Sequence, residues 1–514
     1  MIIGQIVGGT DRSLVIREKK GVNLELGDLV TVEDGGRKYI YMVSVLEYGS
    51  LVEDDRLLTS AGSMLEGTNP NVEIPDKDLR LFRKVTLGPL IEVKTESGET
   101  RAMTPRSLPL FFSKARAITE EDFSFLKKPK NEIFLGRIRS GSKVLDFNYY
   151  LDGDDLLSHH ALISAQTGRG KSNLVKVMLW ETMKQNRFGM LVFDVHNEYF
   201  GAPGGRGLRD HPGAAGSLFY YSKSPPPGQG GRLRINLRTL DFADLDGVIE
   251  FTEAQKQALY YFSRRFKSDW IKELMTEDDA RDEEYDAKGI KLVTVRAIRK
   301  KIGNMFKIEC GAAPFCRDEI FDLETMGEST INDMADHMEQ GKVVLIDGSS
   351  MTDDAGLIIM SAVLREVFRR YEGYRDDGTL KDMPQIGVVL EEAPRVLSEV
   401  SGGNIFGRIA REGRKFKIGL LAVTQIVSVI PDDILANIGT KIIMGNEMAQ
   451  ERRKLIESAS QDLSNYEQII AGLEKGESII SSIFSKFPVP LYTPLFEDIA
   501  RGEGAQKKIN QTFF

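Results

Sequence analysis

Short apolar runs alternate with turn-forming residues through the first hundred positions of this 514-residue chain. The runs include Leu14–Ile16, Leu29–Val32 and Tyr39–Val43, and glycine-containing turns such as Asp34–Gly36 separate them. Short strands at this spacing are typical of small all-β domains, and Asp-Gly-Gly is a favourable hairpin turn. The pattern therefore predicts a small N-terminal β-barrel over residues 1–100.

From about residue 136 the pattern changes to near-continuous apolar runs separated by stretches with a helical period. Strands that are buried on both faces of a parallel sheet have such uninterrupted apolar sequences. Because these runs alternate with helical stretches, the pattern predicts an α/β domain over residues 136–500. Its predicted strands are Ala161–Ser164, Met190–Phe193, Val343–Ile346, Ile386–Leu390, Ile418–Val423 and Lys441–Met444.

Three segments depart from these two patterns. Residues 101–135 are charged and lean toward helix, which predicts a connector between the two domains. Residues 245–340 are polar with a helical period and predict a helical insertion within the α/β domain. Residues 501–514 are polar until the last two phenylalanines, and we expect a C-terminal tail there.

Composition narrows the class of protein. Hydrophobic residues make up 41% and charged residues 28% of the chain, as in soluble globular proteins. The absence of a signal-peptide pattern and of a long apolar run predicts a cytoplasmic protein without a membrane span. Two cysteines, Cys310 and Cys316, are too few for a disulfide framework. The net charge of −8 argues against a uniformly basic nucleic-acid surface but permits a local one.

A glycine-containing loop, Ala165–Ser172, lies between a predicted strand and a predicted helix. Gly168 and Gly170 allow backbone amides to curl around an anion, and the helix N-terminus adds positive potential. Lys171 supplies a charge to the β- and γ-phosphates, and the Ser172 hydroxyl is a ligand for Mg²⁺. Strand, loop and helix together predict a site for ATP and Mg²⁺.

Two glutamates end the apolar run Gln385–Leu390. Phosphoryl transfer requires one carboxylate near Mg²⁺ and another to activate the attacking water. Because side chains alternate along a strand, we assign Glu391 to the metal and Glu392 to the general base. Asp194 and Glu198 follow another predicted strand and should lie at the same edge of the sheet as the phosphate loop.

A polar residue, Gln425, follows the predicted strand Ile418–Val423, where it can sense the γ-phosphate or merely cap the strand. The phosphate loop and the strand ends together provide the residues that we expect to contact the nucleotide. The residues expected to bind the nucleotide are Gln166, Thr167, Gly168, Arg169, Gly170, Lys171, Ser172, Asn173, Asp194 and Glu198.

A basic segment lies between the glutamate pair and Gln425 in the sequence. Arg408, Arg411 and Lys415 share one helical face by their spacing, and Arg414 follows at the helix end. One interpretation is a solvated basic face near a helix C-terminus. The other is an arginine finger, from Arg411 or Arg414, that completes a neighbouring subunit's ATP site. The position of the segment favours the finger.

These motifs, taken in order, resemble those of the HerA family of hexameric ATPases, which are related to FtsK. The resemblance rests on Ser158–Asn173, Phe193–Tyr199, Val388–Ala393, Ile409–Phe416 and Val423–Gln425. In addition, Ile3–Gly8 and Leu26–Val30 are similar to the family's small β-barrel. The resemblance implies a RecA-like P-loop ATPase core preceded by that barrel.

The resemblance also implies a function. A member of this family would be a homo-hexameric DNA translocase or helicase that uses ATP on duplex DNA. It would work beside a NurA-type nuclease in DNA end resection and double-strand break repair. ATP would lie between subunits, with Arg411 or Arg414 reaching in from the neighbour.

Three single residues and one short segment depart from the family pattern. Ala165 replaces the first loop glycine, and Glu391 replaces the usual aspartate. The residues Ile426–Val429 follow Gln425 where relatives more often have an Arg-Pro-Ser-like turn. His159 stands where relatives often have arginine, so a sensor role cannot be transferred there.

Two other functions fit the same motifs. One is a protein-remodelling ATPase that captures substrates with its β-rich domain. The other is a nucleotide-stabilised ring that serves as a scaffold and activates a nuclease or an immune effector. If DNA is the substrate, Lys223, Arg232 and Arg234 in the Gly/Pro-rich loop are the candidates for phosphate contacts.

Overall fold

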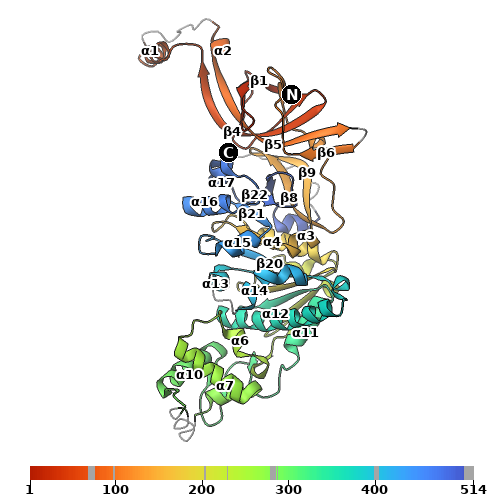
Figure 1. Ribbon diagram of the computed structural model, residues 1–514, viewed down its shortest axis with the longest axis vertical. Helices are drawn as coiled ribbons and strands as arrows, with labels where there is room; N and C mark the ends of the chain where they lie inside the picture. The colour runs from red at the N-terminus through yellow and green to blue at the C-terminus, as the bar shows by residue number, and fades with distance from the viewer. Residues whose placement is uncertain are drawn as a thin grey trace.

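The computed structural model describes residues 1–67, 76–96, 99–201, 204–228, 230–277, 285, 288–398 and 404–502. The molecule is elongated (Figure 1). A β-barrel forms one end, an α/β domain the middle, and a group of helices that includes α7 and α10 the other end. The predicted C-terminal tail lies outside the described residues from position 503 onward.

The N-terminal barrel is closed by six strands in the order β2-β1-β7-β3-β4-β5, because β2 also pairs with β5. The predicted barrel is therefore confirmed. Strand β6 continues the sheet beyond β5 as a hairpin. The strands are β1 (Ile2–Gly9), β2 (Leu14–Glu18), β3 (Leu29–Asp34), β4 (Arg37–Ser50), β5 (Leu81–Glu96), β6 (Glu99–Met103) and β7 (Lys114–Ala117).

The segment 101–135 contains strand where the sequence favoured helix. Strand β7 pairs with β1 and β3 and completes the barrel. It has the sequence Lys-Ala-Arg-Ala, in which Ala115 is fully buried while Lys114 is exposed. Short alternation of charged and small residues has little apolar content, so composition alone conceals this strand.

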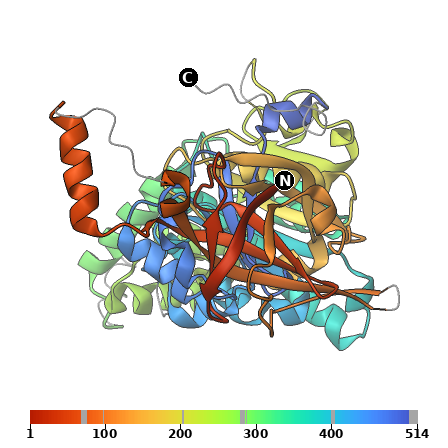
Figure 2. The same ribbon diagram turned by 90° about the horizontal axis from the view of Figure 1, so that it is seen from above.

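Helices α1 (Asp54–Leu65) and α2 (Lys77–Arg80) lie between β4 and β5. Figure 2 shows α1 standing apart from the barrel. No residue of α1 is buried. The barrel core forms without it, from residues such as Ile16, Val30 and Val43.

The α/β domain is built on a sheet of twelve strands in the order β13-β12-β18-β11-β19-β20-β10-β21-β22-β23-β8-β9. Neighbouring strands from β13 to β21 are parallel, as predicted for an α/β core. The parallel strands are β10 (Ala161–Ser164), β11 (Phe188–Asp194), β12 (Leu218–Ser222), β13 (Gly230–Arg232), β18 (Val343–Asp347), β19 (Gln385–Leu390), β20 (Ile418–Thr424) and β21 (Thr440–Met444).

An antiparallel extension follows β21. It consists of β22 (Glu477–Ser482), β23 (Val489–Tyr492), β8 (Glu132–Ser140) and β9 (Lys143–Asp152). Residues just after the barrel thus join the far edge of the central sheet. Two short pairs, β14 (Ile235–Asn236) with β17 (Phe321–Asp322) and β15 (Ile308–Glu309) with β16 (Phe315–Cys316), lie outside this sheet.

Helices pack against the sheet and fill the domain core. Helix α4 contacts β11 and β18, α12 contacts β11, and α14 contacts β20. The helices of this domain are α3 (Gly153–Ser158), α4 (Lys171–Met183), α5 (Ala214–Ser217), α11 (Thr330–Glu339), α12 (Asp353–Asp376), α13 (Pro394–Leu397), α14 (Ile405–Glu412), α15 (Asp432–Asn437), α16 (Ala449–Glu457), α17 (Glu467–Ala471) and α18 (Phe496–Ala500).

The predicted helical insertion is present. It contains α6 (Phe242–Leu245), α7 (Glu253–Phe266), α8 (Trp270–Met275) and α10 (Leu292–Phe306). Trp270 is fully buried, and its indole nitrogen donates to the carbonyl of Leu240 at 2.7 Å. An ion pair of 3.0 Å between Arg365 and the buried Asp244 joins α12 to α6. Across the described residues, no helix is both long and apolar enough to cross a membrane.

Candidate nucleotide site

The phosphate loop has the backbone that its sequence predicts. Gly168 has φ +81° and Gly170 has φ +104°, and only glycine adopts such angles without strain. Helix α4 begins at Lys171, directly after Gly170. Ala165 is buried and is not among the described residues with positive φ, so alanine fits this position without backbone strain.

A cavity of about 510 Å³ lies against this loop at the carboxyl edge of the sheet. Parallel α/β sheets bind their ligands at this edge. The cavity brings together most of the predicted nucleotide and catalytic residues. Those that line it are Thr167, Gly168, Gly170, Lys171, Ser172, Asn173, Asp194, Glu198, Glu391, Glu392 and Gln425.

Two predicted nucleotide contacts, Gln166 and Arg169, do not line this cavity. Arg169 donates to Glu447 at 2.7 Å and to the carbonyl of Leu473 at 3.0 Å. The amide of Gln166 donates to the carbonyl of Gly445 at 3.1 Å. Both residues thus bond the loop to the segment after β21.

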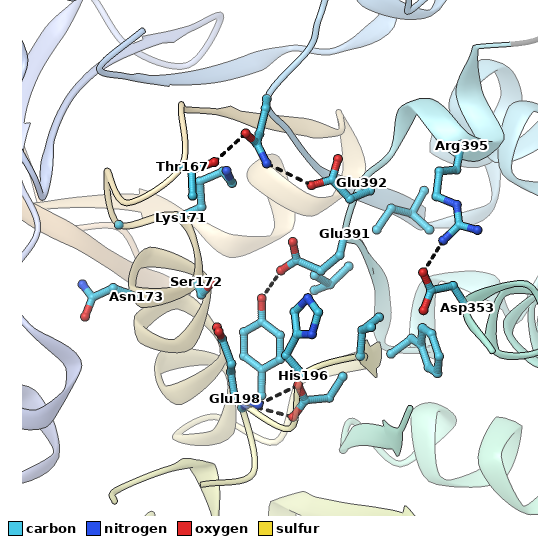
Figure 3. Close-up of a pocket in the computed structure, with 18 of the residues that line it drawn as sticks. Thr167, Lys171, Ser172, Asn173, His196, Glu198, Asp353, Glu391, Glu392 and Arg395 are labelled. Atoms are coloured by element: carbon cyan, nitrogen blue, oxygen red, sulfur yellow. Dashed lines mark hydrogen bonds and ion pairs between the residues drawn. The ribbon is translucent and has the colours of Figure 1, made fainter. Parts of the chain in front are cut away.

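Three polar side chains form a hydrogen-bonded chain across the cavity. The Thr167 hydroxyl donates to Oε1 of Gln425 at 2.8 Å, and Nε2 of Gln425 donates to Oε1 of Glu392 at 3.3 Å (Figure 3). The three residues come from the phosphate loop and from the ends of β20 and β19. Elements far apart in the sequence therefore meet through this chain.

Glu392 has an unusual backbone conformation. Its φ is +50°, which is rare for a residue with a side chain. The turn is fixed on both sides, because the amide of Ala393 donates to Val423 at 3.1 Å and that of Arg395 donates to the Glu392 carbonyl at 3.0 Å. Strained residues of this kind cluster at functional sites, where the surroundings hold them.

Glu391 is half-buried beside Tyr199, whose hydroxyl donates to its Oε1. Burial raises the pKa of Glu391, while the Tyr199 hydrogen bond and the charge of Lys171 act in the opposite direction. Burial likewise lowers the pKa of Lys171, against the charges of Glu392 and Glu391. The Lys171 ammonium also donates to the carbonyl of Ala165 at 3.0 Å.

Asp194 organises the turn that presents Tyr199. It is 1% exposed and accepts hydrogen bonds from the amides of Glu198, Tyr199 and Phe200 at 2.8, 2.8 and 3.3 Å. Both carboxylate oxygens of Asp194 thus accept hydrogen bonds from backbone amides of the following turn. Glu198 is exposed and borders the cavity.

The arginine segment, residues 408–414, does not line the cavity. Arg408 pairs with Glu372 at 2.7 Å and Arg411 pairs with Asp433 at 2.9 Å. Arg414 is exposed, and its charge acts on His159, whose pKa is lowered first by burial and then by this arginine. His159 precedes β10, so Arg414 lies toward the amino edge of the sheet.

Strand β20 separates the arginine segment from the cavity. The segment precedes this strand and Gln425 follows it. Seven residues at about 3.3 Å each span about 23 Å. Arg414 therefore lies away from the cavity of its own chain, and neither Arg411 nor Arg414 is among the residues that line it.

The loop residues predicted to contact DNA have partners within the chain. Lys223 pairs with Asp318 at 3.3 Å, and Arg232 pairs with Glu319. Nη1 of Arg234 lies 2.7 Å from the sulfur of Met326. Neighbouring carboxylates thus neutralise two of the three charges, which weakens the case for DNA contacts at these positions.

Sequence reasoning missed Arg395, which borders the cavity from α13. It pairs with Asp353 at 2.6 Å and with Asp354 at 2.8 Å, both in the first turn of α12 (Figure 3). Arg395 comes three residues after Glu392 and ties the glutamate turn to α12. Two acids at a helix start usually signal capping alone, so nothing in the sequence pattern points to this ion pair.

Glu451 explains how the unusual segment after Gln425 folds. This carboxylate is 1% exposed and accepts from the amides of Val427 and Ser428 at 2.6 and 2.9 Å. It also accepts from the Ser428 hydroxyl at 2.6 Å. The buried side chain of Glu451, from α16, thus holds the turn after β20.

Comparison with known proteins agrees with this geometry. A family model described as the central domain of the helicase HerA matches residues 133–367. Over this stretch the chain resembles the HerA helicases. The chain is a P-loop ATPase, as the sequence predicted.

Two curated relatives illustrate the similarity. A "DNA double-strand break repair helicase HerA" of Sulfurisphaera tokodaii is 26% identical over 512 residues, which cover 97% of this chain and 94% of the relative. The protein of the same name from Pyrococcus furiosus is 25% identical over 391 residues, which cover 66% and 65%. Among solved structures, the bacterial conjugative coupling protein TrwBdeltaN70 in complex with sulphate has a TM-score of 0.47 and 12% identity, covering 75% of this chain and 95% of that one.

Proposed function

We propose that this chain is a motor of the HerA family, driven by ATP, that acts on duplex DNA in double-strand break repair. The observation that supports this most strongly is the hydrogen-bonded chain from Thr167 through Gln425 to Glu392. It joins the phosphate loop, a γ-phosphate sensor and a general base within one cavity. The relatives named as double-strand break repair helicases supply the expected substrate.

The cavity residues divide the chemistry among themselves. Lys171 and the loop amides hold the phosphates, and Glu392 takes the proton of the attacking water. Gln425 is hydrogen-bonded to Glu392 and reports the loss of the γ-phosphate to the loop through Thr167. Ser172 and Glu391 fit an Mg²⁺ ion, which needs few protein ligands and neutralises phosphate charge when bound.

A homo-hexameric ring accounts for the arginine segment. Neither Arg411 nor Arg414 lines the cavity of its own chain, so a neighbouring subunit's cavity is the ATP site that they can complete. A cyclic ring places the amino-edge surface of one subunit against the carboxyl-edge surface of the next. By analogy with the family, a NurA-type nuclease is the expected partner.

The direct test is ATP turnover by the full chain with and without blunt duplex DNA. A motor on DNA predicts stimulation by duplex and none by an unfolded protein. Stimulation by unfolded protein alone would favour a remodelling ATPase. Full activation of a partner nuclease by Lys171→Ala or Glu392→Gln would favour a scaffold instead.

A further inference from the structure

Helix α10 differs in charge from the rest of this acidic chain. The chain has a net charge of −8, yet α10 contains four cations and no acid. The cations are Arg296, Arg299, Lys300 and Lys301. Two lysines, Lys288 and Lys291, precede the helix.

The cations of α10 fall into two groups. Arg299 is buried and donates to the carbonyls of Leu274 and Thr276, both at 2.7 Å, and Lys301 donates to the carbonyl of Glu250 at 2.8 Å. These two stabilise the insertion. Arg296 and Lys300 are exposed, and neither has an ion-pair partner among the described residues.

Helix stability does not account for this exposed pair. Arg296 and Lys300 are four residues apart, so their like charges face one another and destabilise the helix. Lys291 is the N-cap of α10, where the helix dipole disfavours a cation. Because these cations destabilise the helix in both ways, we infer that they bind an anionic partner outside the chain.

A cleft of about 380 Å³ continues this basic face. Arg299, Lys300 and Asn304 of α10 line it together with Lys307 and Arg317. The one carboxylate among its described lining residues, Glu309, already pairs with Arg317. Lys307 pairs with Asp318 at 2.6 Å, so Lys300 is the exposed lysine of the cleft that has no ion-pair partner among the described residues. Asn304 adds an uncharged hydrogen-bond donor.

The position of this surface also matters. Helix α10 lies at the end of the molecule opposite the barrel (Figure 1). A ring repeats any such surface once per subunit, so two cations per chain become a basic collar. By contrast, Lys223 and Arg232 are occupied by Asp318 and Glu319.

We propose that the exposed face of α10, with Arg296 and Lys300 at its centre, binds the phosphate backbone of duplex DNA at the end opposite the barrel. The proposal rests on the proposed function, because it names where that motor holds its substrate. Cations that contact only phosphates bind DNA irrespective of its base sequence, and this binding weakens as the salt concentration rises.

The test is binding of a fluorescent blunt duplex to the full chain between about 50 and 200 mM salt, comparing wild type with R296Q/K300Q. Glutamine keeps the helical propensity and removes both charges. We expect R296Q/K300Q to bind at least about tenfold more weakly at the low-salt end. The slope of log K against log salt should become shallower by about 0.9 for each phosphate that the variant no longer neutralises.

The matched control is K84Q/K114Q, which removes two exposed barrel lysines that also lack ion-pair partners among the described residues. It should keep the wild-type slope, and equal unfolding temperatures would exclude a folding defect. A wild-type slope in R296Q/K300Q would overturn the proposal and leave the motor intact. Absence of duplex binding by the wild type would overturn the proposed function itself.

Discussion

The cavity and the arginine segment differ in how their charged groups are satisfied. In the cavity, Thr167, Gln425 and Glu392 are joined to one another within one chain. In the arginine segment, Arg408 and Arg411 pair with surface acids, and Arg414 is exposed at the other side of the sheet. The polar groups of one region bond to one another, whereas the arginines of the other pair with acids on the surface or are exposed.

This difference supports the proposal that one copy of the chain does not complete an ATP site. Strand β20 is about 23 Å long, Gln425 follows its carboxyl end, and the arginine segment precedes its other end in the sequence. In the proposed ring, this rigid element would connect two ATP sites. Substitutions in the two regions should therefore differ in the size and kind of their effects.

The largest effect should come from Glu392. Replacing it by glutamine keeps its size but removes the base, so we expect kcat to fall about 10²–10⁴-fold with nucleotide binding retained. Turnover and nucleotide binding by fluorescence measure the two quantities. The control is Glu47→Gln, at an exposed acid of the barrel that does not line the cavity. Equal losses in both variants would remove Glu392 from its assigned role.

Substitution of Arg395 should reduce kcat less than substitution of Glu392. It anchors the turn of Glu392 to α12 through Asp353 and Asp354, so Arg395→Gln should lower kcat about tenfold, or about 1.4 kcal/mol of barrier. KM should stay unchanged, because the arginine positions the base and does not bind ATP. Steady-state kinetics separate the two, and Arg395→Lys should restore part of the loss. A raised KM with normal kcat would instead indicate direct nucleotide binding.

Arg408 should have a small structural effect. It pairs with Glu372 and lies 4.1 Å from the Phe368 ring centroid, on an exposed surface. Arg408→Ala should therefore cost at most about 1 kcal/mol of unfolding free energy. Denaturant unfolding measures this cost. A loss of ATP turnover as large as that of Glu392→Gln would show that Arg408, and not Arg411 or Arg414, acts at the ATP site.

The smallest expected effect is on His159. Burial and then the charge of Arg414 lower its pKa, so the folded state favours neutral histidine and loses stability as pH falls below the usual histidine value. Arg414→Ala should raise the pKa of His159 and lessen that loss. A histidine titration followed by NMR measures the shift. An unchanged pKa would mean that Arg414 does not lie near His159.

The sequence was sufficient for the features that depend on local chemistry. The strand, loop and helix around Lys171 were predicted because glycine backbone freedom and strand–helix order are local properties. The confirmed α/β core with its barrel followed from hydrophobic patterning. The placement of Glu391 and Glu392 at a strand end followed from the same patterning.

The missing features depend on contacts between distant segments. Arg395 meets Asp353 across 42 positions, and Glu451 closes a turn 23 or 24 positions away. Strand β7 needs the rest of the barrel to become a strand. Likewise, the acids that neutralise Lys223 and Arg232 come from about 90 positions later in the chain. Composition and spacing do not reveal such partners.

The proposed ring requires that each ATP site is shared between two copies of the chain. The most direct measurement mixes two inactive variants, Glu392→Gln and the double variant R411A/R414A, after subunit exchange is verified by fluorescence energy transfer. At equal proportions, about a quarter of the interfaces would join an intact Glu392 to intact arginines from the neighbour. We predict ATP turnover well above that of either variant alone. If the arginines act within their own chain, every site remains defective, and the absence of any recovery would contradict the shared site.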